Sequence, residues 1–212
     1  IIDKRHIPFV TIDGAGLSSS VNIGIDDSKA AYDLMNLVLR AGHRSIAVIS
    51  LKISLDPDDP GEIYRSRIVQ NRLAGVEAAW KQFVEETGKH IAVTVYYADA
   101  NLESSRSVLQ AMFNEGIRPD AIVCLSDIAA LAAYDVCNHL GYAIPDTISI
   151  AGFDGIELSS IMRPSLTTVV QSGYEKGIKA AQAIVAMMKN EPSETVLLNY
   201  HLFYGDSIKN IQ

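Results

Sequence analysis

The chain has 212 residues, 48% of them hydrophobic and 20% charged, which suits a globular fold with a large core. The formal net charge of −7 argues against a surface that grips the DNA backbone by itself, since such domains are usually basic. No apolar run approaches the roughly 20 residues that a membrane-spanning helix needs, and no N-terminal stretch is typical of a signal peptide. Because the chain starts at Ile1 rather than Met, the possibility of a removed leader peptide stays open.

Short runs rich in valine and isoleucine alternate with longer segments of helical periodicity. The predicted strands are mostly apolar on both faces, as buried parallel strands are; they are Ile7–Ile12, Ser45–Ile49, Ala92–Tyr97, Ala121–Leu125, Ile148–Ala151 and Thr167–Val170. The predicted helices lie between strands and mostly stop at a glycine; they are Asp26–Ala41, Leu73–Thr87, Leu102–Asn114, Ile128–Leu140 and Gly173–Lys189. This alternation predicts a doubly wound α/β fold with a parallel sheet.

Two features concern loops and ends. The segment Ser54–Glu62 is rich in aspartate and proline and is predicted to be an exposed loop after a strand, where α/β sheets bind ligands. The helix Gly173–Lys189 carries an apolar face that needs a sheet to cover it, and the first strand has almost nothing before it. We therefore expect further β/α units upstream of Ile1.

The sequence contains no complete motif for nucleotide binding, metal binding or catalysis. Gly14-Ala15-Gly16 follows a strand but lacks the third glycine of a dinucleotide-binding loop, so it is read as a turn. The five histidines lack metal-ligand spacing, and no nucleophile is paired with a base, which predicts no metal, no cofactor and no catalysis. Cys124 and Cys137 lie in apolar patterns and are predicted to be buried, reduced thiols; a disulfide or a reactive thiol is the alternative.

Polar side chains gather where predicted strands end. Asp13, Ser126, Asp127 and Asp154 follow strands, and Arg72 opens a predicted helix beyond another. Each has a plain structural alternative, because aspartates cap helices and turns and an arginine is often a surface cation. If the fold brings them together, carboxylates and an arginine suit a polyhydroxylated ligand such as a sugar.

Five segments, in order, resemble one family. They are 42–47 (GHRSIA), 71–76 (NRLAGV), 118–127 (RPDAIVCLSD), 144–154 (IPDTISIAGFD) and 164–171 (PSLTTVVQ). The chain is similar in these segments to the lactose/galactose-repressor (LacI/GalR) family of bacterial transcription regulators. The resemblance runs from about Ile7 to the C-terminus and covers roughly the last two-thirds of a full regulator.

The resemblance implies a two-lobed α/β effector domain, similar to the sugar-binding proteins of bacterial transporters. Each lobe is a parallel sheet flanked by helices, and the N-terminal lobe is expected to be incomplete in this chain. Residues 1–24 and 170–191 are assigned to that lobe, and residues 25–169 and 192–212 to the C-terminal lobe. A small effector between the lobes would shift DNA affinity by hinge closure.

Site residues follow from the same alignment. Arg72 matches the family's ligand-contacting arginine, Asp154 its ligand aspartate, and Asp13 an aspartate that some members use. Ser126 stands where the family usually has asparagine, which weakens that contact. The family's dimer interface would involve the apolar side chains of Leu131, Leu158, Ile161 and Met162, for which core packing is the alternative.

The function implied is that of a cytoplasmic, homodimeric repressor-type regulator and not an enzyme. A sugar or sugar derivative is the expected effector, with nucleobases and phosphorylated compounds left open. Operator DNA would be bound through a helix-turn-helix head that this chain lacks, and no membrane contact is expected. The alternative is a periplasmic sugar-binding protein of an ABC transporter, which shares the fold and the cleft.

Overall fold

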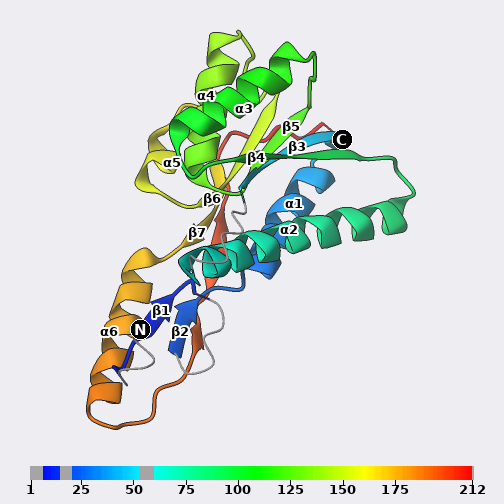
Figure 1. The fold of residues 1–212 in the computed structure, drawn as a ribbon. Coiled ribbons are helices and arrows are strands. Elements are labelled where there is room, and N and C mark those ends of the chain that lie inside the picture. Colours follow the sequence, from blue (N-terminus) through cyan, green and yellow to red (C-terminus); the bar gives the residue numbers. More distant parts are fainter. Residues whose placement is uncertain (1–6, 15–20, 53–59, 212) are drawn as a thin grey trace.

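The computed structural model describes residues 7–14, 21–52 and 60–211, with the backbone alone for residues 60–66. These residues form two sheets of different size (Figure 1). The large sheet contains, in order across it, β4 (Ala92–Ala98), β3 (Ser45–Leu51), β5 (Ala121–Cys124), β6 (Ser149–Asp154), β7 (Thr167–Gln171) and β9 (Tyr200–Phe203). The small sheet contains β1 (Val10–Ile12), β2 (Val21–Gly24) and β8 (Val196–Leu197).

Helices cover both faces of the large sheet, which confirms the predicted doubly wound fold. Along β3, Ile46 and Val48 pack with α1 (Asp27–Arg40) and α2 (Pro60–Thr87), while Ala47 and Ile49 pack with α3 (Leu102–Asn114) and α4 (Asp127–His139). This alternation is why the strands are apolar on both faces. The short α5 (Glu157–Ile161) follows β6, and α6 (Gly173–Met188) packs against the small sheet (Figure 1).

The structure departs from the predicted elements in three places. The large sheet is not wholly parallel, because its edge strand β9 runs antiparallel to β7. The strands β2, β8 and β9 and the helix α5 lack long β-branched or helical patterns and were not predicted. The third departure concerns α2, which begins at Pro60 rather than Leu73 because proline is accepted at the first helical position.

The predicted loop Ser54–Glu62 is therefore wrong at its last three residues, which belong to α2. Its other residues, 54–59, lie outside the described residues. Ala15 and Gly16 of the predicted turn also lie outside them.

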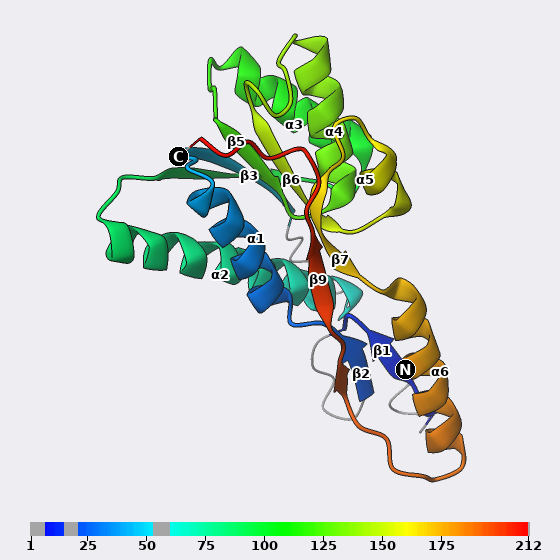
Figure 2. The same ribbon diagram turned by 180° about the vertical axis from the view of Figure 1, so that it is seen from behind.

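Three short connections join the two sheets. The chain passes from β2 to α1 over residues 24–27, from β7 to α6 over 171–173, and from β8 to β9 over 197–200. Figure 2 shows β7 and β9 side by side in the region that joins the two sheets. The lobe boundaries remain our proposal; because β8 pairs with β2, we propose that residues 192–197 go with the small sheet.

Helices α1 and α2 touch at a glycine. A Cβ on Gly75 would stand 2.0 Å from the carbonyl oxygen of Ser28 in the first turn of α1. Only a residue without a side chain permits this approach, which packs α2 closely against α1.

We expect Gly75→Ala to lower the free energy of unfolding by about 1–3 kcal/mol, because the helices must move apart. The measurement is urea unfolding. Gly177→Ala on α6, where a Cβ meets nothing within 4 Å, is the matched control and should be neutral or stabilising by up to about 1 kcal/mol. Equal effects of the two substitutions would contradict the close approach.

A buried polar group anchors the segment after β9. His43 is buried, with Nε2 3.1 Å from the carbonyl oxygen of Lys209 and Nδ1 3.4 Å from Oδ1 of Asp120. The other oxygen of Asp120 accepts hydrogen bonds from the backbone N–H groups of Arg44 (2.9 Å) and Ser45 (3.1 Å). Burial acts to raise the pKa of Asp120, but His43 and the two backbone donors together hold it below the usual 3.8.

A carboxyl group whose pKa is lowered on folding stabilises the protein above its unfolded pKa, and this stabilisation is lost as the pH falls through the folded value. We expect Asp120→Asn to be less stable than the wild type at neutral pH and to approach it as the pH drops below 3.8. Urea unfolding of both proteins between pH 7 and about pH 3 measures this. A difference that stays constant with pH would contradict the assignment.

Candidate functional site

A cavity of about 290 Å³ opens at the carboxyl ends of the large sheet's strands. It lies where the strand order reverses: β4 is on one side of β3 and β5 on the other, and ligands bind at such switch points in open α/β sheets. Its polar lining comes from Arg72, Ser126 and Asp154, and its apolar lining from Leu51, Ile68, Val69, Ala100 and Ile128. Three of the four predicted ligand residues therefore share one cavity; their contact with a ligand remains a prediction.

Arg72 lies in the middle of α2, not at the start of a helix as predicted, because α2 extends back to Pro60. Its side chain is almost fully buried and fixed from three directions. Nε donates to Oδ1 of Asp27 at 2.8 Å, Nη1 donates to the carbonyl oxygen of Leu125 at 2.8 Å, and the guanidinium stacks 3.8 Å from the ring centre of Phe153. The arginine is thus held rigidly at the rim of the cavity.

Asp154 ends β6 in an unusual backbone conformation, with a φ of 127° that side chains rarely adopt. Its Oδ1 accepts a hydrogen bond from Nε2 of Gln171 at 2.8 Å and lies 3.5 Å from Nη1 of Arg72. Burial raises the pKa of Asp154, and Arg72 opposes that rise. Strain of this kind persists where the surroundings impose it, often at binding sites.

The surroundings of Asp154 are set by Asp127. This fully buried carboxylate accepts hydrogen bonds from the backbone N–H groups of Gly155 (2.8 Å) and Ile156 (2.9 Å) and from the hydroxyls of Ser159 and Thr168 (2.7 Å each). Asp127 therefore fixes the turn that follows β6. Its role is structural support, which was the plainer of the two sequence readings.

Ser126 combines capping with exposure to the cavity. Its Oγ accepts a hydrogen bond from the backbone N–H of Ala129 at 3.2 Å, which caps α4. The hydroxyl proton is not used by that contact, so the side chain can still donate to a ligand in the cavity that it lines.

Asp13 does not line the cavity. It follows β1 with a φ of 53°, and both of its carboxylate oxygens accept from Nζ of the buried Lys176 at 2.6 Å. Lys176 also donates to Oε1 of Gln171 at 2.5 Å, and Gln171 in turn donates to Asp154. A continuous set of polar contacts thus joins the small sheet to the cavity.

The sequence reading missed two members of this arrangement, Asp27 and Lys176. Asp27 reads as an ordinary acidic residue in a helix's first turn, and Lys176 as a surface cation on α6. Gln171 enters the sequence prediction only as the last residue of the segment 164–171 (PSLTTVVQ). Lys176 is 163 residues from Asp13, a separation that no local pattern reveals.

The predicted interface side chains differ in exposure. Leu158 is 49% exposed and Ile161 64%, which is high for apolar residues, while Leu131 and Met162 are half-buried and Met162 packs on the core. Only the first two have the exposure that a subunit contact requires, and the interface stays a prediction.

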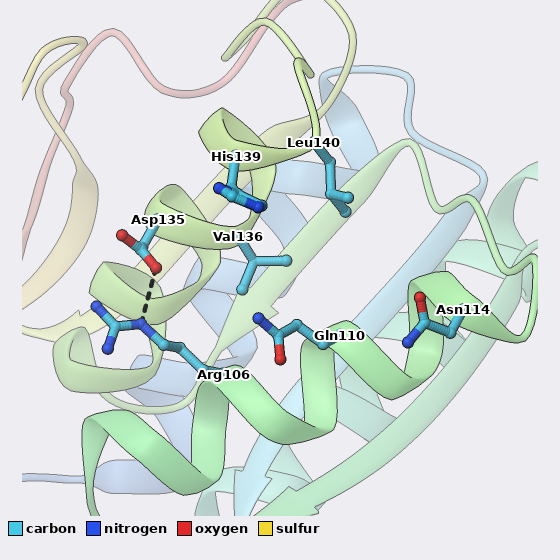
Figure 3. Close-up of a pocket in the computed structure, with 7 residues that line it drawn as sticks. All are labelled: Arg106, Gln110, Asn114, Asp135, Val136, His139 and Leu140. Atoms are coloured by element: carbon cyan, nitrogen blue, oxygen red, sulfur yellow. Dashed lines mark hydrogen bonds and ion pairs between the residues drawn. The ribbon is translucent and has the colours of Figure 1, made fainter.

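A larger hollow of about 480 Å³ lies between α3 and α4, away from the predicted residues (Figure 3). Its principal charged groups, Arg106 and Asp135, pair with each other at 2.7 Å. Both side chains are largely exposed, and among the described residues that line this hollow none is a buried charge. We therefore assign the functional site to the smaller cavity at the switch point.

Within the described residues, no group of histidine, cysteine and acidic side chains is arranged to hold a metal ion, and none of the helices is long and apolar enough to cross a membrane. Cys124 and Cys137 are free and buried, as predicted, and burial raises the pKa of Cys137 to about 12.

Comparison with known families decides the classification. Residues 36–208 match the family described as periplasmic binding protein-like domain. The chain belongs to this family. The fold and the resemblance derived from the five sequence segments are therefore confirmed.

Curated relatives of this periplasmic binding protein-like domain include proteins named as transcriptional repressors. The ribose operon repressor of Haemophilus influenzae is 31% identical over 183 residues, which are 85% of this chain and 51% of that protein. The HTH-type transcriptional repressor PurR of Klebsiella pneumoniae is 28% identical over 204 residues, 94% of this chain and 55% of that protein. The domain thus spans about half the length of the curated relatives it matches.

Solved structures share the fold. A LacI family transcriptional regulator from Enterococcus faecium with bound ribose superposes with a TM-score of 0.82 at 18% identity, covering 100% of this chain and 74% of that chain. A putative transcriptional regulator LacI from Bacillus cereus subsp. cytotoxis gives 0.83 at 23% identity, covering 100% and 71%.

Proposed function

We propose that this domain is the effector-binding and dimerising part of a LacI/GalR-type transcription regulator. The observation that carries the proposal is the cavity at the switch point, where Arg72, Ser126 and Asp154 meet in a domain whose curated relatives are named as repressors. Those names favour a regulator over the transporter-linked sugar-binding alternative. The effector is a small ligand, a sugar first of all, since ribose is bound in one structural neighbour.

The rest of the regulator follows from the same relationship. Operator DNA is bound by a helix-turn-helix head elsewhere in the protein, two copies associate through the exposed face of α5 that carries Leu158 and Ile161, and the protein acts in the cytoplasm without catalysing a reaction. Effector preference for one arrangement of the lobes supplies the coupling to DNA, typically about 1–3 kcal/mol.

The test is a thermal-shift screen of the protein against sugars, sugar phosphates and nucleobases. A ligand at 100 times its dissociation constant stabilises the fold by about 2.7 kcal/mol, which raises the melting temperature measurably. We expect at least one such ligand, with its effect abolished in Ile128→Trp, where the larger side chain fills the cavity. Stabilisation by none of these compounds would contradict the proposed effector site.

A further inference from the structure

The charges around the cavity narrow the chemistry of the effector, an inference that rests on the proposed function of this site. Among the side chains that the structure describes, the two buried cations near the cavity, Arg72 and Lys176, already have carboxylate partners. Arg72 is held by Asp27 at 2.8 Å, and Lys176 is held by both oxygens of Asp13 at 2.6 Å. Neither has a whole positive charge left for an anionic ligand.

Two further carboxylates, Asp127 and Asp154, are not balanced by cations of their own. Asp127 receives only neutral donors, and Asp154 shares Arg72 at 3.5 Å. Of these six groups only Arg72 and Asp154 line the cavity, and the other four lie behind its polar lining. Together they carry two positive and four negative formal charges, an excess of two negative charges. An anion brought there meets repulsion in a partly desolvated site.

The opposite wall gives an anion no compensation either. It is built from Leu51, Ile68, Val69, Ala100 and Ile128, and among the side chains that the structure describes it contains no cation. The neighbouring Lys52 lies outside this lining and is paired with Asp99 at 3.2 Å.

What remains available suits a neutral ring. Nη2 of Arg72 makes no hydrogen bond within the described part of the chain, Ser126 keeps its hydroxyl proton, and Asp154 offers acceptor oxygens. A hydroxyl group can accept from Arg72 and donate to Asp154 at once, while a C–H face lies on the apolar wall.

We propose that the effector is an uncharged monosaccharide and that the site discriminates against the phosphate esters and acids of the same sugar. The hydroxyl-bearing edge meets Arg72, Ser126 and Asp154, and the apolar face packs against the wall that includes Ile128.

The test is isothermal titration calorimetry with matched pairs: D-ribose and D-ribose 5-phosphate, D-glucose and D-glucose 6-phosphate, D-glucose and D-glucuronate. We expect the tightest ligand to be uncharged and its charged counterpart to bind about 100-fold more weakly, equivalent to about 2.8 kcal/mol. Ile128→Trp should abolish binding, and Arg106→Ala, whose ion pair lies between α3 and α4, should leave it unchanged.

Asp154→Asn gives a second readout. It removes one negative charge and keeps the shape, so the preference for the uncharged member of the pair should fall about tenfold even if both members bind more weakly. If a charged sugar binds as tightly as its neutral counterpart, and Ile128→Trp abolishes that binding, this inference is overturned but the proposed effector site is supported. If no sugar binds in a way that Ile128→Trp abolishes, both this inference and the proposed effector site are overturned.

Discussion

Asp127→Ala is expected to lower the free energy of unfolding by about 4 kcal/mol. The carboxylate is fully buried and accepts four hydrogen bonds, two from the backbone of the turn after β6 and two from hydroxyl groups on α5 and β7. Alanine leaves these donors without their acceptor, two of them on the buried residues Ser159 and Thr168 and two on the partly buried Gly155 and Ile156. Urea unfolding followed by circular dichroism measures the loss.

Asp127→Asn is the informative comparison. Its carbonyl oxygen can still accept from Gly155 and Ile156, and its amide can donate to the Thr168 hydroxyl, which is able to reverse its role. We therefore expect a loss of about 1–2 kcal/mol. Asp135→Ala on the exposed face of α4 is the control and should change stability by less than about 0.5 kcal/mol. Equal losses for asparagine and alanine would show that the hydrogen bonds are not the source.

Much of the fold was predictable because its signals are local. Helix α3 has the predicted bounds, and the glycines after it and after α4 mark where each helix ends. The buried strands of the large sheet are predicted correctly because each is a run of apolar residues. The edge strand β9 gives no such signal, because none of its four residues (YHLF) is buried and its antiparallel direction is set by pairing with β7, which is distant in the sequence.

The candidate site was predictable only in part. Strand exits in a parallel sheet meet at one edge, and that rule places Ser126 and Asp154 at one cavity. Arg72 lines the same cavity from the middle of α2. The start of α2 was not predicted, because Pro60 and Gly61 are typical of loops. Asp13 lies at the neighbouring sheet instead, because Lys176 holds it there. These long-range pairs depend on how the two sheets are joined, which no local pattern encodes.

Arg72→Met is expected to lower the free energy of unfolding by about 3–5 kcal/mol, because it leaves Asp27 buried without its cation. Burial raises the pKa of Asp27 and Arg72 opposes that rise, so the unpaired carboxyl would be still harder to ionise. The circular dichroism spectrum of the folded variant should match the wild type, but its urea midpoint should fall well below it. Asp27→Leu alone should cost less, because Arg72 keeps Leu125 and Asp154 as partners and reaches the cavity.

The double variant Asp27→Leu/Arg72→Met separates stability from binding. With both charges replaced by apolar groups of similar size, the buried ion pair and its desolvation cost disappear together, so at least half of the stability lost in Arg72→Met should return. Effector binding should not return, because no guanidinium faces the cavity. A double variant that is as unstable as the sum of the single ones would mean that Asp27 and Arg72 are not coupled. A double variant that is stable and still binds the effector would show that Arg72 does not contact the effector. A double variant that is stable but has lost binding would show that Arg72 recognises the effector, independently of its contribution to stability.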